Sequence, residues 1–206
     1  MVKAVCFDLG GVLVQIHHNW EEALAAAGLD ALCAPGIIRP LPDFEAIELF
    51  QMARISEDEY LLELSKHLNT TPAEAKRVHM TVLRDAYPGT HELIEELNKK
   101  SIITGCLSNT SAPHWLVMLE DPEYANIQSL HHKLASHELK CHKPSAEMYE
   151  AFEQAVGVAP DEIVYFDDGR AHVEAAKARG WRGHWIDSLG DTAAQMRTAL
   201  HAEGVL

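Results

Sequence analysis

The chain lacks paired cysteines and long apolar runs. Its four cysteines, Cys6, Cys33, Cys106 and Cys141, form no CxxC pair and no zinc-type spacing, so the sequence offers neither a disulfide framework nor a cysteine metal site. The apolar stretch at the start is too short to cross a bilayer, is interrupted by Asp8, and lacks the basic flank and longer apolar region of a signal peptide. These features favour a cytoplasmic protein with no membrane partner.

Positive charge is also scarce. The 206 residues include 17 Lys and Arg against 31 Asp and Glu, which gives a formal net charge of −14. This excess of acid argues against nucleic acid or an anionic membrane as the main partner, and it requires a local cation wherever an anionic substrate binds. The remaining composition, 47% apolar and 23% charged, is that of an ordinary globular protein, and no obligatory protein partner is indicated.

Apolar runs of strand length alternate with helical patterns from residue 88 onward. Together with the run at 2–7, strands are expected at 102–107, at 163–166 and, as a short last strand, at 185–186, with a weaker one near 133–136. The helices expected in this part of the chain span 90–100, 112–119, 143–156, 170–179 and 192–202, and Lys143-Pro144 is expected to open the third of them. The alternation predicts an α/β fold, a Rossmann-like doubly wound parallel sheet with helices on both faces.

Residues 15–87 show a different pattern. Helices are expected at 20–28, 44–54 and 60–68, and a further helix from Thr71-Pro72 through about Ala86, with no convincing strand among them. We therefore predict a helical cap domain at 15–87, inserted after the first strand. The core domain is then built from residues 1–14 and 88–206.

Polar residues stand where the predicted core strands end. Asp8 follows the first strand, Ser108 a second, and the pair Asp167-Asp168 a third, while Lys143 lies at a predicted helix start. A single Asp beside a turn is most simply structural. Four such positions together are different, because the carboxyl ends of parallel strands meet at one edge of the sheet, where these folds bind ligands.

The chemistry of these residues is complementary. Several carboxylates and a glycine carbonyl suit Mg²⁺, a hard cation that prefers oxygen ligands. A lysine and a serine hydroxyl suit phosphate oxygens. An Asp can act as nucleophile and form an aspartyl-phosphate. The sequence thus predicts phosphoryl transfer at the edge of the sheet.

These stretches resemble the four ordered motifs of the haloacid dehalogenase superfamily of hydrolases. The motifs are Phe7-Asp8-Leu9-Gly10-Gly11-Val12-Leu13, Leu107-Ser108-Asn109-Thr110, Lys143-Pro144 and Phe166-Asp167-Asp168. The resemblance spans nearly the whole chain and is closest to the branch that contains α-D-glucose-1-phosphate phosphatase, which also shows a Tyr shortly after the KP pair, here Tyr149. It implies a Mg²⁺-dependent phosphatase that hydrolyses a small phosphorylated metabolite, with a sugar phosphate, and within that class a hexose 1-phosphate, as the leading candidate.

The resemblance also assigns roles to residues. It implies Asp8 as nucleophile, Ser108 and Lys143 as further catalytic residues, and metal ligation by Asp8, the Gly10 carbonyl, Asp168 and, from beside it, Asp167. Phosphate and substrate contacts are expected from Ser108, Asn109, Lys143, Gly11, and, where cap and core should meet, His17 and Trp20.

The sequence departs from the family pattern at two positions. Most phosphatases of the superfamily carry a second Asp two residues after the nucleophile as general acid and base, whereas this chain has Gly10. Related phosphatases share the glycine, yet two alternatives stay open: a metal-independent 2-haloacid dehalogenase and a non-catalytic protein that binds phosphate ligands. The second departure is His172, in place of an Asn, for which a hydrogen bond within its loop is the simpler expectation.

Overall fold

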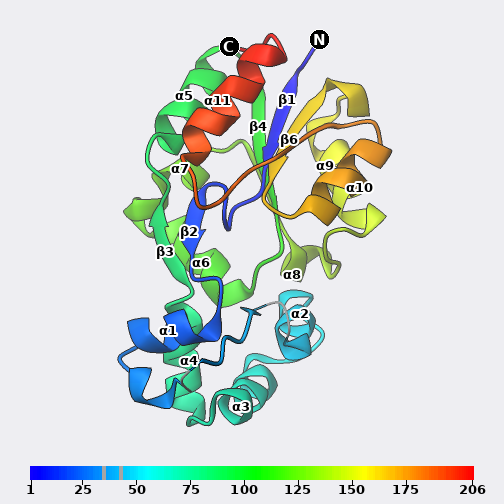
Figure 1. Cartoon of the computed structure of the whole chain (residues 1–206). Helices are drawn as coiled ribbons and strands as arrows, with labels where there is room; N and C mark the ends of the chain where they lie inside the picture. The colour runs from blue at the N-terminus through cyan, green and yellow to red at the C-terminus, as the bar shows by residue number, and fades with distance from the viewer. Residues whose placement is uncertain (34–35, 42–43) are drawn as a thin grey trace.

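The computed structural model describes residues 1–33, 36–41 and 44–206. Figure 1 shows two lobes: an α/β core that contains both ends of the chain, and a helical lobe made of α1 to α4, which we call the cap. None of the helices in the described ranges combines the length and the hydropathy needed to cross a bilayer. The boundaries at residues 15 and 87 stay a prediction.

The core is a five-stranded sheet with the strand order β5-β4-β1-β6-β7, and every pair in it is parallel. Its strands are β1 (Ala4–Phe7), β4 (Ile103–Ser108), β5 (His132–Ala135), β6 (Ile163–Asp167) and β7 (Arg182–Trp185). The first strand therefore lies at the centre, between β4 and β6. The predicted doubly wound α/β fold is confirmed.

Helices cover both faces of the sheet (Figure 1). They are α5 (Thr90–Lys99), α6 (Ala112–Glu120), α7 (Ala125–Gln128), α8 (Ser136–Leu139), α9 (Ala146–Val156), α10 (Arg170–Ala178) and α11 (Thr192–Ala202), joined in part by short 3₁₀ turns at Pro122–Tyr124 and Pro160–Glu162. Alternate residues of β1 point to opposite faces. Val5 and Phe7 pack in the cluster that contains α5 and α11, whereas Ala4 and Cys6 pack against α9 and α10. Both faces of β1 are therefore buried, which explains its continuous apolar sequence.

The cap has an apolar cluster of its own. The elements of the cap are α1 (Trp20–Ala26), a 3₁₀ turn at Asp30–Leu32, α2 (Glu45–Gln51), α3 (Glu57–Leu68) and α4 (Pro72–Met80). Asn19 caps α1, and capping boxes headed by Ser56 and Thr71 begin α3 and α4. The buried cap residues include Trp20, Phe50, Tyr60 and Leu64.

Two predictions about local structure are wrong. The segment expected to be entirely helical is bounded by a two-stranded antiparallel sheet of β2 (Val14–Ile16) and β3 (Leu83–Ala86), so the helix expected through Ala86 ends at Met80. This pairing joins segments far apart in the sequence, and no periodicity within either segment reveals it. The helix expected to open at Lys143-Pro144 begins instead at Ala146, with Ser145 as its N-cap residue. Lys143 and Pro144 thus belong to a turn, closed by the hydrogen bond from Ser145 N–H to the carbonyl of His142 (2.8 Å), that leads into α9.

Candidate active site

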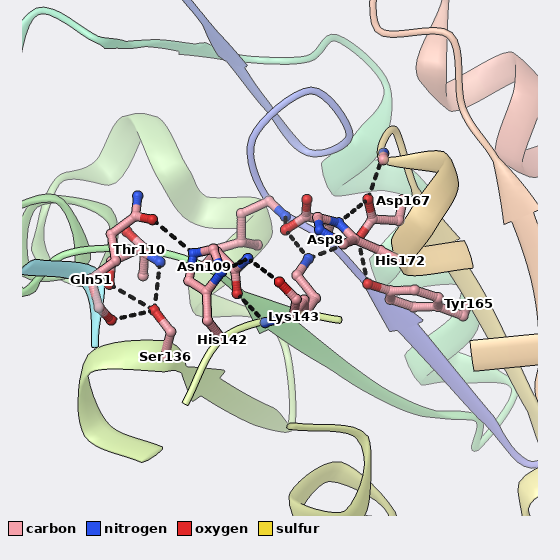
Figure 2. A network of polar contacts seen from close by, with 12 residues as sticks. Asp8, Gln51, Asn109, Thr110, Ser136, His142, Lys143, Tyr165, Asp167 and His172 are labelled. Carbon is pink, nitrogen blue, oxygen red and sulfur yellow. Dashed lines mark hydrogen bonds and ion pairs between the residues drawn. The ribbon is translucent and has the colours of Figure 1, made fainter. Parts of the chain in front are cut away.

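The polar residues at the strand ends converge as predicted. Asp8 follows β1, Ser108 is the last residue of β4, and Asp167 is the last residue of β6. Because β1 lies between β4 and β6, the three positions are neighbours at the carboxyl edge of the sheet. Lys143 joins them from the loop between α8 and α9 (Figure 2).

Lys143 is the central cation of the site. Its side chain is fully buried, and its Nζ lies 2.9 Å from Asp8 Oδ1 and 2.7 Å from Asp167 Oδ2. Burial opposes the charge of the ammonium, but the two carboxylates outweigh burial and hold the pKa of Lys143 above its usual range. The lysine is therefore charged and fixed between both strand ends.

Asp167 is saturated with hydrogen-bond donors. Lys143 Nζ and the Tyr165 hydroxyl donate to its Oδ2, while the backbone N–H of Gly169 (2.7 Å) and His172 Nδ1 (3.0 Å) donate to its Oδ1. Burial alone would raise the pKa of Asp167, but Lys143 and His172 hold it below its usual range. Asp167 is thus an ionised anchor for the lysine, and His172 makes the loop hydrogen bond expected from the sequence.

Asp8 and Asp168 are less well neutralised. Asp8 Oδ1 accepts the N–H of Leu9 (2.7 Å) and pairs with Lys143, whereas Asp8 Oδ2 has no hydrogen-bond partner among the described residues. Burial raises the pKa of Asp8, against the opposing charge of Lys143. The carboxylate of Asp168 forms no hydrogen bond or ion pair within the described ranges. Burial, together with the nearby charges of Asp8 and Asp167, raises its pKa to about 7.

This imbalance fits a divalent cation. Three carboxylates share a single lysine, and two of them have oxygens that protein donors leave free. The ligand atoms of Asp8, Asp167 and His172 also lie within 4.8 Å of one another. Asp167 and His172 are occupied with each other, however, and Mg²⁺ prefers oxygen ligands. The residues that fit Mg²⁺ best are therefore Asp8 and Asp168.

The two glycines that follow Asp8 and Leu9 differ in their surroundings. Gly11 adopts a φ of +78°, and a Cβ at this position would lie 2.3 Å from Asp168 Oδ2, so the glycine makes room for the Asp168 carboxylate. Its N–H donates to the carbonyl of Val14, and Gly11 does not line the cavity that Asp8 lines. Gly10 does line that cavity, and a Cβ there would lie 3.3 Å from Ile16 Cδ1.

A cavity of about 410 Å³ opens beside these residues. Its polar end is formed by Asp8, Ser108, Asn109 and Asp168. The opposite wall comes largely from the cap, with Leu41, Ile47, Glu48 and Gln51, and from β2, β3 and α6, with Ile16, Leu83, His114 and Met118. Its size is that of a site for a small molecule. Cap and core thus enclose one cavity with the charged residues at its core end.

Other predicted contacts lie elsewhere. His17 lines a second cavity of about 680 Å³, and its Nδ1 lies 3.5 Å from Glu22 Oε2. Trp20 is fully buried in the apolar cluster of the cap and lines neither cavity. The structure therefore does not bring His17 and Trp20 to the site. Their neighbour His18 lines both cavities.

Sequence reasoning missed several residues that complete the site. Tyr165 supports Asp167 from within β6, and His142 and Gln51 form part of a hydrogen-bond chain next to Lys143 (Figure 2). His114 lines the cavity from α6 and donates through Nε2 to the carbonyl of His79 in the cap. The only feature of the sequence that could have pointed to His142 is its place next to Lys143. No feature of the sequence points to Gln51.

The structure thus combines a parallel α/β sheet with a buried Asp–Lys–Asp cluster at the core end of a capped cavity. The chain belongs to the haloacid dehalogenase-like hydrolases, whose family profile matches residues 2–180. The resemblance to this family is thereby confirmed.

Individual relatives agree with this assignment. A phosphatase of Mycobacterium tuberculosis is 26% identical over 93% of this chain and 90% of its own length. A phosphorylated carbohydrates phosphatase of Thermotoga maritima is 26% identical over 98% of this chain and 93% of its own length. A HAD family enzyme of Bacteroides thetaiotaomicron, solved with magnesium and inorganic phosphate, has the same fold, with a TM-score of 0.76 at 18% identity over 96% of this chain and all of that one.

Proposed function

We propose that the protein is a Mg²⁺-dependent phosphatase that hydrolyses a small phosphorylated metabolite through an aspartyl-phosphate on Asp8. The observation that carries the proposal is the position of Asp8. Its Oδ1 is held by Leu9 and Lys143, while Oδ2 has no partner among the described residues, and the side chain lines the cavity. A carboxylate fixed by one oxygen presents the other as a nucleophile.

The protein side chains would act in a simple order. Asp8 Oδ2 attacks phosphorus, the bond from phosphorus to the leaving oxygen breaks, and the alcohol takes up a proton. Water then attacks the phosphorus of the aspartyl-phosphate, which releases inorganic phosphate and restores Asp8. The hydroxyl of Ser108, the backbone N–H of Asn109 and the ammonium of Lys143, which lies beside Asp8, would hold the phosphoryl oxygens in place. When bound by Asp8, Asp168 and the carbonyl of Gly10, Mg²⁺ would neutralise charge on the transferred group.

The leading substrate class is a sugar phosphate, and within it a hexose 1-phosphate. The cavity has the volume of a small metabolite, and a relative of this chain is named a phosphorylated carbohydrates phosphatase. We place the activity in the cytoplasm, where phosphorylated metabolites occur. The α-D-glucose-1-phosphate phosphatase-like branch is part of the same proposal.

Two alternatives make different predictions. A metal-independent 2-haloacid dehalogenase would have no use for Asp168, a carboxylate whose position beside two others is costly without a cation. A phosphate-binding protein without turnover would follow from Gly10, which supplies no proton donor beside the nucleophile.

Phosphate release from a panel of phosphorylated metabolites, with Mg²⁺ and with EDTA, tests the proposal. We expect turnover with Mg²⁺ and its loss on chelation, restored by excess Mg²⁺. Halide release from 2-haloacids that is indifferent to EDTA would favour the dehalogenase. Phosphate binding by calorimetry with no turnover of any compound would favour the binding protein.

A further inference from the structure

Gln51, the last residue of α2, connects the cap to the active site. Its side chain Oε1 lies 3.1 Å from His142 Nε2, and its backbone carbonyl accepts the hydroxyl of Ser136 at 2.6 Å. Ser136 in turn accepts the N–H of Thr110 at 2.9 Å, in the loop that follows Ser108. Gln51 thus contacts the loop that contains Lys143 directly, through His142, and reaches the loop after Ser108 through Ser136 (Figure 2).

The side-chain branch continues without a break to the catalytic lysine. His142 Nδ1 lies 3.0 Å from Asn109 Nδ2. Asn109 then forms hydrogen bonds with both backbone polar groups of Lys143. Asn109 Oδ1 accepts the Lys143 N–H at 2.8 Å, and Asn109 Nδ2 donates to the Lys143 carbonyl at 3.1 Å. The backbone that carries the buried lysine is therefore held by Asn109 as a neighbouring strand would hold it.

In the series of hydrogen bonds from Lys143 through Asn109 and His142 to Gln51, one donor fixes the direction of all the others. The N–H of Lys143 can only donate, which fixes Oδ1 of Asn109 as acceptor and turns Nδ2 toward His142. An amide nitrogen can only donate, so His142 Nδ1 accepts and its proton is on Nε2. Nε2–H then requires an acceptor, which is Oε1 of Gln51. The orientation of the lysine backbone and the tautomer of His142 are thus linked to a cap side chain.

The electrostatic environment keeps His142 in the state that the chain requires. Burial, with a further contribution from the charge of Lys143, lowers the pKa of His142 to about 4. The ring is therefore neutral near pH 7 and able to accept at one nitrogen while it donates from the other.

We propose that Gln51 and His142 are positioning residues, which act through Asn109 to hold Lys143 in its catalytic place while the cap is docked on the core. This proposal rests on the proposed phosphatase function for its kinetic consequence but not for its structural one. Neither residue needs to touch the phosphoryl group. The cap would thus contribute to the chemistry, in addition to forming the wall of the cavity.

A matched control lies three residues along the chain. Arg54 Nη2 donates to the carbonyl of Lys140 at 3.1 Å. This hydrogen bond also joins cap to core, but it is not connected to Lys143. The test therefore compares Gln51→Ala, which keeps the backbone bond to Ser136, with Arg54→Ala. Gln51→Glu keeps an acceptor for His142 and serves as the rescue variant.

The first measurement needs no activity. ¹⁵N NMR of the imidazoles in the full-length protein should show the Nε2–H tautomer for His142 in the wild type and in all three variants, because Asn109 fixes it. The Nε2–H proton itself should exchange with water at least about 10-fold faster in Gln51→Ala alone, because that variant removes its acceptor. Hydrogen exchange of the Lys143 amide should become at least about 10-fold faster in Gln51→Ala alone, because its Asn109 partner is less well held. The Nδ1–H tautomer in the wild type, or unchanged exchange in Gln51→Ala, would overturn the proposal.

The second measurement separates positioning from substrate contact. Acetyl phosphate is too small to reach the cap wall, so a residue that only binds the leaving group would not affect its turnover. With Mg²⁺ present, Gln51→Ala should lower kcat for acetyl phosphate by about 10- to 100-fold. His142→Ala should do the same, the double variant should be no worse than either, and Arg54→Ala should match the wild type. Full acetyl phosphate turnover in Gln51→Ala, or additive losses in the double variant, would contradict the proposal. A wild type that hydrolyses no phosphate ester would instead refute the phosphatase function, and the NMR result would still decide the connection from Gln51 to Lys143.

Discussion

The core and the cap use their polar residues in opposite ways. At the strand ends the core concentrates Asp8, Asp167, Asp168 and Lys143, and the carboxylates of Asp8 and Asp168 have oxygens with no donor among the described residues. The cap encloses an apolar cluster and contributes mainly apolar side chains, such as Leu41 and Ile47, to the cavity wall. Under the proposed function, this difference predicts that the core carries out the reaction and that the cap selects the leaving group. Gln51 is the exception, because this cap residue contacts His142 in the core next to Lys143.

The largest expected effect is loss of the nucleophile. Asp8→Asn preserves the shape and the hydrogen bond from Leu9, but the amide does not attack phosphorus, so turnover of every phosphate ester should fall by more than about 10⁴-fold. Lys143 keeps its partner Asp167, and we expect the fold to survive. Phosphate release and circular dichroism measure the two outcomes. Substantial activity in a folded Asp8→Asn protein would show that the core does not supply the nucleophile from Asp8.

The second prediction concerns the uncompensated charge of the core. The pKa of Asp168 is about 7 in the folded protein against an ordinary value of 3.8, so the folded state binds more protons than the unfolded state between about pH 4 and pH 7. Stability must therefore fall as the pH rises through this window. In EDTA we expect the free energy of unfolding to be about 2–3 kcal/mol lower at pH 8 than at pH 5 because of this group.

Urea unfolding of chelated wild type and Asp168→Asn tests the prediction. The variant should lose most of this pH dependence and be the more stable protein at pH 8, whereas Asp161→Asn, at an exposed acid, should behave like the wild type. Mg²⁺ should restore stability to the wild type at pH 8. Equal pH profiles for wild type and Asp168→Asn would show that the carboxylate is already compensated within the protein.

The third prediction tests the selective role of the cap. Ile47 lines the cavity from α2, and Ile47→Val removes one methyl group from its wall. We expect kcat/KM for the best substrate to change by roughly 10-fold relative to its competitors, while acetyl phosphate turnover stays the same. Ile55→Val, which packs in the same apolar cluster but does not line the cavity, is the control. Equal changes for acetyl phosphate and for the larger substrates would contradict a purely selective cap wall.

The same contrast explains what the sequence could predict. Asp8, Ser108 and Asp168 were predictable because each follows a buried apolar strand, and parallel strand ends meet whatever the details of packing. The pairing of β2 with β3 could not be predicted, because each segment is short and its partner lies at the other end of the cap sequence. Gln51 was not predictable either. A glutamine at the end of an amphipathic helix is ordinary, and its contact with His142 depends on how the cap docks.

The smallest expected effect concerns Gly10. With no carboxylic acid there, poor leaving groups depart unassisted, so hexose 1-phosphates and activated aryl phosphates should react faster than hexose 6-phosphates. The anomeric hydroxyl is the more acidic alcohol and needs less protonation. An acid at this position would meet Ile16, whose Cδ1 lies 3.3 Å from the place of the new Cβ. Gly10→Asp should therefore speed poor leaving groups only several-fold, below the roughly 10²–10⁴ of a well-placed general acid.

The dependence of the phosphorylation rate on the leaving-group pKa measures this effect. It should be steep in the wild type, slightly flatter in Gly10→Asp, and flatter again in Gly10→Asp with Ile16→Val, because the shorter side chain gives the acid room to reach the leaving oxygen. Ile16→Val alone, the control, should keep the steep dependence. A flat dependence in the wild type would mean that another group already delivers the proton. His18 and His114, which line the cavity from the cap side and from α6, would then be the first residues to replace.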